Sequence, residues 1–436
     1  MKKLLFIWEQ LISSFWFIPI LMLSLVIGSA FGFIYLDNQI EYAPGGLFKY
    51  LLPASVESAR NILTIIAGAM IGIAGTVFSI TLVVLTLASS QLGSRLVRNF
   101  MYDKLNQVVL GTCVASFVYC LIVLSSLKQN GNFHFIPVIS VFDAMVVAIA
   151  GIILLIIFIH HVSISIQSDK VISDISDAMS KSIRKLFPEE IGHEEEKPAP
   201  DVEAIKKKFA FRQEIKSAKG GYLQSVDGDG LLSIAEENDC LILLHHRPGD
   251  FLVKDMVICE VLGEGKCSKD IHENINDDFI IGKVRTPLQD AEFSIHQMVE
   301  VASRALSPGV NDPYTAIACI DNLTTVMCYL ARVQFPSPYR YDRRGKLRVI
   351  ADSHTFYGML NAAFNQIRQY AEANPSVLIR LLEAMITINR FAINKAQKKE
   401  LVQHAKMIMN AAERTFHETR DLNDMKKRFN ILKSNQ

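Results

Sequence analysis

Residues 61–94 read NILTIIAGAMIGIAGTVFSITLVVLTLASSQLGS, and none of these 34 side chains is charged. As a helix the run would extend roughly 50 Å at ~1.5 Å per residue, whereas the hydrocarbon core of a bilayer is roughly 30 Å thick. The run is therefore longer than a membrane is thick. We expect this helix to cross the membrane and to continue inside protein beyond it.

Three further stretches meet the length and hydropathy criteria for crossing a membrane. The four predicted spans cover residues 15–36, 62–88, 108–127 and 137–162. The first span has the charged start of a secretory signal, but Phe31, Phe33 and Tyr35 stand where a small-residue cleavage site would lie. We therefore expect it to be retained in the membrane.

The distribution of basic residues predicts the orientation, since cytoplasmic segments keep an excess of lysine and arginine. Basic residues are more frequent at the amino terminus, after the second span and after the fourth span than in the other two loops. The richer segments hold Lys2, Lys3, Arg95, Arg98, Lys104, Lys170, Lys181, Arg184 and Lys185, and the poorer loops hold Lys49, Arg60 and Lys128. This pattern predicts a protein of the bacterial cytoplasmic (inner) membrane with both termini in the cytoplasm.

Charge and cysteine content exclude several classes of partner. Residues 1–162 contain 8 Lys and Arg against 6 Asp and Glu, and the remaining residues are almost balanced, so no basic region predicts nucleic-acid binding. The seven cysteines form no CxxC pair and show no His/Cys ligand spacing. We therefore predict no structural zinc, no disulfide framework and no cofactor.

Beyond the spans the sequence predicts a cytoplasmic α+β region. Residues 163–187 have the apolar periodicity of an amphipathic stalk helix, and residues 188–213 lose it and are predicted to be a linker. Residues 214–285 contain short β-like runs separated by Gly and Asp, in a pattern similar to a barrel-sandwich module. A helix-like insertion at 229–238 interrupts that pattern.

Residues 286–436 are predicted to form a helical domain. A helix ending near Ala305 is followed by the break Ser307–Asn311, after which Asp312 is suited to cap a new helix with Pro313 in its first turn. These two helices should form an αα-hairpin. Three more helices are expected at 349–373, 376–393 and 396–416, with a short basic helix near the end.

Unusual residues gather around the break between the first two helices of this domain. The candidate binding residues are Arg285, Asp290, Arg304, Ser307, Asn311, Asp312 and Thr315. A helix amino terminus flanked by two arginines can hold a phosphate or carboxylate group, or a protein partner. The alternative is structural, because Glu300 and Arg304 are spaced to pair on a helix and Asp312 occupies the amide groups that an anion would need.

Two segments of the chain carry a resemblance to a known family. GAMIGIAGTVFSITLVVLTLASSQLGSRLVRNFM at 68–101 and FSIHQMVEVASRALSPGVNDPYTA at 293–316, together with the four spans, resemble the domain-of-unknown-function 2254 family of predicted bacterial membrane proteins. The resemblance covers nearly the whole chain. It implies a membrane location and this architecture, and it carries no activity and no catalytic residue.

Small and hydroxyl side chains form a stripe along one face of the second span. They are Gly68, Gly72, Gly75, Ser79, Thr86 and Ser90. Such a stripe either lets helix backbones approach closely or, repeated around a homo-oligomer, lines a water-filled path. Asp143 is the ionisable residue best placed inside a span, and a carboxylate there is typical of a functional site that faces a partner or water.

Enzyme signatures are weak, and the chain is predicted not to be an enzyme. It lacks the nucleophile elbow, the P-loop and the HExxH motif. His245–His246, the DGDG turn at 227–230 and His272–Glu273 are minor candidates. Two hypotheses stay open, namely an oligomeric pore or transporter with a cytoplasmic regulatory domain, and a membrane-anchored sensor or scaffold that binds an anionic ligand or a protein.

Overall fold

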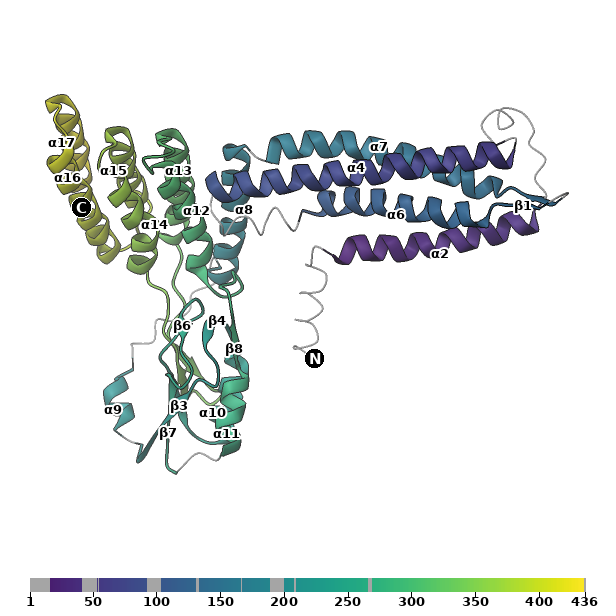
Figure 1. Ribbon diagram of the computed structural model, residues 1–436. Helices are drawn as coiled ribbons and strands as arrows, with labels where there is room; N and C mark the ends of the chain where they lie inside the picture. The colour runs from purple at the N-terminus through teal and green to yellow at the C-terminus, as the bar shows by residue number, and fades with distance from the viewer. Residues whose placement is uncertain are drawn as a thin grey trace. The chain divides into compact units, whose positions relative to one another are not determined.

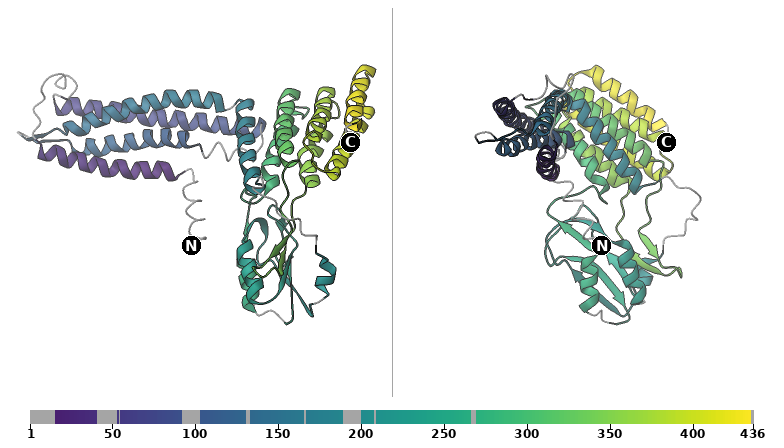
Figure 2. Two further views of the ribbon diagram at one scale, coloured as in Figure 1. Left: turned by 180° about the vertical axis from the view of Figure 1, so that it is seen from behind. Right: turned by 90° about the vertical axis from the view of Figure 1, so that its right-hand side faces the viewer.

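The computed structural model describes residues 16–40, 53, 55–91, 103–130, 133–165, 167–188, 200–207, 209–265 and 269–434. It comprises two compact units, Met1–Lys170 and Val171–Gln436, which we call the membrane unit and the C-terminal unit (Figures 1 and 2). Several residues named above lie outside the described ones. They are Lys2, Lys3, Lys49, Arg95, Arg98, residues 189–199 and 208 of the predicted linker, and the side chain of Ser90.

The membrane unit consists of four long helices and one small hairpin. The helices are α2 (Phe17–Gln39), α4 (Val56–Gln91), α6 (Lys104–Ser126) and α7 (Val138–Ser165). All four are long and apolar enough to cross a membrane, which confirms the four apolar helices predicted from the sequence. The strands β1 (Lys128–Asn130) and β2 (Phe133–Phe135) pair antiparallel between α6 and α7.

Helix α6 is the centre of the membrane unit. It packs against α2, α4 and α7, and half of its apolar window is buried, compared with 6% for α2. The absence of a side chain at Gly111 makes this packing possible, since a Cβ there would lie 2.9 Å from Met22 Sδ and 3.2 Å from Pro19 Cα. The close helix approach within this unit therefore occurs at a glycine of α6.

Helix α4 presents two different faces. Leu63, Ala67, Met70, Ala74 and Val77 are buried against the neighbouring helices. The predicted stripe lies on the other side, where Gly68, Gly72, Gly75, Ser79 and Thr86 are exposed. A Cβ added at any of the three glycines would meet no heavy atom within 4 Å. Among the described residues, the three glycines of the stripe thus have open space beside them.

The C-terminal unit contains two sheets. The five-stranded sheet has the order β3-β7-β5-β10-β9, and the three-stranded sheet has the order β6-β4-β8. The strands are β3 (Phe211–Lys216), β4 (Gly221–Val226), β5 (Leu241–Leu244), β6 (Phe251–Leu252), β7 (Val257–Gly263), β8 (Phe279–Gly282), β9 (Tyr339–Tyr341) and β10 (Leu347–Ile350). Most neighbouring strands are antiparallel, but β5 and β10 are parallel.

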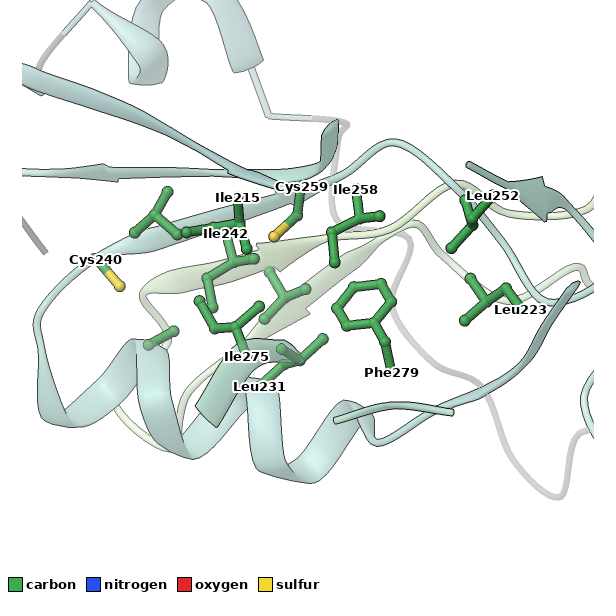
Figure 3. Packing of buried hydrophobic residues seen from close by; sticks show 13 residues of the cluster. Ile215, Leu223, Leu231, Cys240, Ile242, Leu252, Ile258, Cys259, Ile275 and Phe279 are labelled. Atoms are coloured by element: carbon green, nitrogen blue, oxygen red, sulfur yellow. The ribbon is translucent and has the colours of Figure 1, made fainter. Parts of the chain in front are cut away.

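Both sheets contribute to one apolar core, together with α10 (Gly228–Glu237) and α11 (Lys269–Asp277). Figure 3 shows Ile242 and Phe279 of two strands near Leu231 and Ile275 of the two helices, and Leu223 beside Leu252 at the other end of the core. Successive residues of a strand point to opposite faces. Leu241 and Leu243 accordingly join a second cluster on the other face of the five-stranded sheet.

Two sequence predictions for this unit need correction. The sequence predicts only helices after Pro287, but residues 339–341 and 347–350 form β9 and β10 of the five-stranded sheet. The predicted helix 349–373 therefore begins later, as α14 (Phe356–Tyr370), where Thr355 caps it by accepting a hydrogen bond from the Gly358 amide at 3.1 Å. The barrel-sandwich pattern is not confirmed, because the five-stranded sheet takes β9 and β10 from outside residues 214–285.

The remaining helices are α8 (Ser168–Leu186), the short α9 (Val202–Lys206), α12 (Ala291–Ala305), α13 (Pro313–Leu330), α15 (Pro375–Asn389), α16 (Lys395–Thr415) and α17 (Thr419–Ser434). Five of them pack on one another, α12 against α13, α13 against α15, and α15, α16 and α17 together (Figure 1). The predicted cap is confirmed, since Asp312 accepts a hydrogen bond from the Thr315 amide at 3.1 Å and Pro313 starts α13. Helix α8 is joined to α13 by a hydrogen bond of 2.6 Å from the Tyr329 hydroxyl to the Phe187 carbonyl oxygen.

A histidine is buried between α14 and α16. His404 is 1% exposed, and its Nε2 lies 3.0 Å from Oδ1 of Asn361. Burial, and next the charge of Arg368, lower the pKa of His404 to about 4. The folded chain therefore holds this imidazole neutral at pH values where an unfolded chain would bind a proton.

This shift predicts an acid-sensitive fold. Below the ordinary histidine pKa of 6.5 the imidazole is protonated in the unfolded state but not in the folded state. The free energy of unfolding therefore falls between pH 6.5 and about 4, by up to about 3 kcal/mol. His404→Gln, whose amide can still bond to Asn361, should reduce this loss in thermal unfolding of the full chain. His417→Gln, at an exposed position, is the matched control. An unchanged pH dependence in His404→Gln would contradict the assignment.

Candidate functional site

A pocket of about 410 Å³ opens in the C-terminal unit. It exists because β5 and β10 are parallel neighbours, with Val349 opposite Ile242 and Ile350 opposite Leu243. The carboxyl ends of parallel strands lie at the same edge of a sheet, so the segments that follow them meet there. Eight polar or charged residues line the pocket, namely Asp229, His246, Arg247, Gln289, Arg340, Asp352, Ser353 and His354.

Arg247 joins the two segments. Its side chain is 27% exposed, and its Nη2 donates a hydrogen bond to Oε1 of Glu292 at 2.8 Å. Its Nη1 lies 3.7 Å from Oδ2 of Asp352, which is longer than a hydrogen bond. The Asp352 side chain is 56% exposed. One edge of the guanidinium is therefore held firmly by α12, while the other faces a weakly attached carboxylate.

The firmly held partner, Glu292, lies in the first turn of α12 and is largely buried. His354 Nδ1 is 3.8 Å from its Oε1, which is also longer than a hydrogen bond. His354, and then Arg247 and His296, hold the pKa of the Glu292 carboxyl below its usual value, against the effect of burial. Glu292 is thus a stable anion that fixes Arg247 in position.

The other polar side chains are positioned by strand ends and turns. His246 Nδ1 lies 3.5 Å from Oδ2 of Asp250, which also accepts a hydrogen bond from the Arg247 amide at 3.1 Å. Arg340, on β9, is exposed and donates to the carbonyl oxygens of Ser337 and Tyr339. His246 and Arg340 are therefore further hydrogen-bond donors in the pocket that Arg247 lines. Within the described residues, no group of three or more His, Cys, Asp and Glu side chains is arranged to hold a metal ion.

The predicted anion cluster is divided by α12. Arg285 and Asp290 lie at its amino end, where Arg285 binds Asp290 through two hydrogen bonds, from Nε at 2.7 Å and from Nη2 at 2.9 Å. Asp290 is 1% exposed and also caps α12 by accepting from the Phe293 amide at 3.1 Å. This pair has the geometry of a structural contact, since each side chain satisfies the other.

The rest of the predicted cluster lies at the other end of α12, about 20 Å away along its 15 residues. Arg304 lies 3.7 Å from Glu300, and the Ser307 hydroxyl donates to the Arg304 carbonyl oxygen at 2.7 Å. Asn311 adopts the left-handed conformation with φ of 49°. Hydrogen bonds from Thr315 lower the pKa of Asp312. The structure therefore does not bring the two arginines of the prediction together.

In the membrane unit the structure adds an unpredicted carboxylate beside the predicted one. Asp143 of α7 is partly buried and interacts with Tyr119 of α6, whose hydroxyl donates to the Ser140 carbonyl oxygen at 3.1 Å. Asp37, at the end of α2, caps α7 by accepting hydrogen bonds from the Ile139 amide at 2.8 Å and the Ser140 amide at 3.0 Å. Asp37 lies one residue beyond the predicted first span.

Sequence reasoning singled out His246 and the DGDG turn only as minor candidates, and it missed Arg247, Asp352 and His354. The signal was present in part, since His246 and Arg247 directly follow the apolar run of β5. The sequence predicts that residues 347–350 belong to a helical domain, so it gives no indication that they form a strand beside β5. The pocket could not be recognised without that pairing.

Comparison with known proteins gives the same family as the sequence motifs. The family described as Predicted membrane protein (DUF2254) matches residues 12–387. Uncharacterized protein Rv1290c of Mycobacterium tuberculosis and uncharacterized protein Mb1321c of Mycobacterium bovis are each 30% identical to the chain over 422 residues. The matches cover 95% of this chain and 79% of each relative. No solved structure matches the chain significantly.

The divided cluster predicts unequal effects of two substitutions. Asp290→Ala removes a helix cap and leaves Arg285 without its carboxylate, so it should lower the free energy of unfolding by about 2–4 kcal/mol. Arg304→Ala removes a half-exposed contact and should cost less than about 1 kcal/mol. Denaturant titration of both variants measures the difference. Equal losses would contradict the structural role of the Arg285–Asp290 pair.

Proposed function

The chain belongs to the domain-of-unknown-function 2254 family of predicted membrane proteins, and we propose that it is a membrane-anchored sensor whose C-terminal unit binds a small anion. The observation that carries this proposal is Arg247, which lines the pocket with one edge held by Glu292 and the other edge 3.7 Å from an exposed carboxylate. The four apolar helices of the membrane unit provide the anchor.

The chemistry of Arg247 supports an anion as the ligand. A guanidinium keeps its charge at all physiological pH values and has five donors in a planar fork that matches carboxylate and phosphate oxygens. Hydrogen bonds in which both partners are charged are roughly twice as strong as neutral ones. An incoming oxyanion would form such bonds with Nη1, and Asp352 would turn into solvent.

The neighbouring donors support the same ligand. His246, His354 and Arg340 line the pocket together with Arg247 and can donate to further oxygen atoms. Glu292 accepts a hydrogen bond from Arg247 and so orients the guanidinium before a ligand arrives. This reduces the conformational entropy that the Arg247 side chain loses when an anion binds. Following the distribution of basic residues, we place the pocket in the bacterial cytoplasm, where it would sample soluble metabolites.

Anion binding is tested by thermal unfolding of the full-length protein in detergent with sodium acetate or inorganic phosphate as the probe. Arg247→Ala should weaken the saturable, probe-dependent stabilisation at least tenfold, because it removes the charge that both probes bind. Phosphate also stabilises proteins non-specifically, so the difference between the variants is the measured quantity. Arg420→Ala, on the exposed surface of α17, is the matched control. Identical curves for the Arg247→Ala and parent proteins would contradict the proposal.

A second candidate function is an oligomeric pore, and the exposed stripe of α4 favours it. Gly68, Gly72, Gly75, Ser79 and Thr86 face away from the packed side of their own unit, and the three glycines have open space beside them. In a homo-oligomer these faces would surround a shared path through the bilayer.

Substitution of two glycines separates the pore from simple folding. Gly72→Leu should abolish ion flux from liposomes and leave the monomer folded, because a Cβ at residue 72 would meet no heavy atom of another helix within 4 Å. Gly111→Leu should unfold the membrane unit, because its side chain would overlap Met22 and Pro19. Absence of flux through the parent protein would contradict the pore.

A further inference from the structure

We propose that the ligand of this pocket is an amphipathic oxyanion, with a carboxylate or phosphate group on a short apolar body. This inference rests on the proposed anion binding at Arg247 and adds the chemistry of the rest of the ligand. The oxyanion would lie against the outer edge of Arg247, which is the Nη1 side of the guanidinium that faces Asp352. The apolar body would lie against the wall that the core presents to the same pocket.

The wall is an extension of the apolar core. Leu231 and Val349 line the pocket and are also buried members of the core, with exposures of 0% and 3%. Val226, Leu232 and Leu244 line it as well and are only partly buried. These three side chains form the part of the wall that a ligand can cover. They come from β4, α10 and β5, so the wall belongs to regular structure on several sides.

A fourth side of the wall is fixed by aromatic packing. Phe187 lines the pocket, and its ring centroid lies 4.9 Å from that of Phe335 and 6.1 Å from that of His354. The Tyr329 hydroxyl holds its carbonyl oxygen. Because these contacts fix Phe187 without a ligand, little conformational entropy remains to be lost on binding. His354 touches both the apolar side and Glu292, so the two halves of the pocket are adjacent.

Apolar walls determine which anion binds best. An inorganic anion at Arg247 leaves Val226, Leu232 and Leu244 in contact with water, whereas an apolar body covers them. Each buried methylene group contributes about 0.8 kcal/mol, which corresponds to roughly fourfold in affinity. The volume of about 410 Å³ lies near the lower end of the range for small-molecule sites. A short acyl chain or one aromatic ring suits this space.

The experiment is a calorimetric titration of the full-length protein in detergent with acetate, butanoate and hexanoate. Affinity should rise along the series, by at least about tenfold from acetate to hexanoate. Leu232→Ala and the isosteric Val226→Thr should flatten the rise, by lowering the affinity for hexanoate more than the affinity for acetate. Ile431→Ala, half-exposed on α17, should keep the full rise. Arg247→Ala should weaken all three probes.

The outcomes separate this inference from the proposed function. Equal affinity for acetate and hexanoate would overturn the amphipathic ligand and leave anion binding intact. No binding of any probe would overturn both. Hexanoate binding that is insensitive to Arg247→Ala and to both wall variants would place the probe in the detergent and also overturn the inference.

A second arm identifies the source of the ligand. The hexanoate titration is repeated in phosphatidylcholine nanodiscs with and without phosphatidylglycerol. If an anionic lipid occupies the pocket, phosphatidylglycerol should compete and lower the apparent hexanoate affinity. If the ligand is a soluble organic acid, the affinity should be the same in both nanodiscs. Either result supports an amphipathic oxyanion, provided that the affinity rises from acetate to hexanoate.

Discussion

β5 and β10 run side by side in the same direction, although about 100 residues of chain separate them, and the pocket is a consequence of this pairing. Val349 and Ile242 pack into one core and hold the two strands in register. The register in turn brings Arg247, which follows β5, to 3.7 Å from Asp352, which follows β10. A change that separated these strands would remove the binding geometry together with the sheet.

The ion pairs around Arg247 differ in strength, and this difference gives the pocket its chemical character. Glu292 belongs to the first turn of α12, so the charged partner of Arg247 is fixed to a helix with a buried face. Asp352 follows the carboxyl end of β10, and its exposed side chain is attached loosely. A buried pair fixes geometry, whereas an exposed pair contributes little and is easily exchanged. The guanidinium of Arg247 can therefore be held in a fixed orientation by Glu292 and still bind an anion on the side of Asp352.

Much of the architecture could be predicted from local sequence signals. The four spans follow from uninterrupted apolar runs, and the Asp312–Pro313 start of α13 follows from capping chemistry. The site could not be predicted, because it depends on a long-range parallel pairing that leaves no local signal in four residues of β10. The packing of the membrane helices likewise could not be predicted from local sequence. The glycine stripe of α4 suggested a close helix approach, but its glycines are exposed, and a close approach is found at Gly111 of α6.

Asp352→Asn tests most directly whether the outer edge of Arg247 can bind an anion. Asparagine keeps the size of the side chain and removes the charge that competes with an anion for this edge. Acetate titrated into the full-length variant should bind about two- to fivefold more tightly than to the parent protein, as expected when an exposed ion pair is removed. Unchanged or weaker acetate binding would contradict the account, because Asp352 would then not occupy the site of the anion.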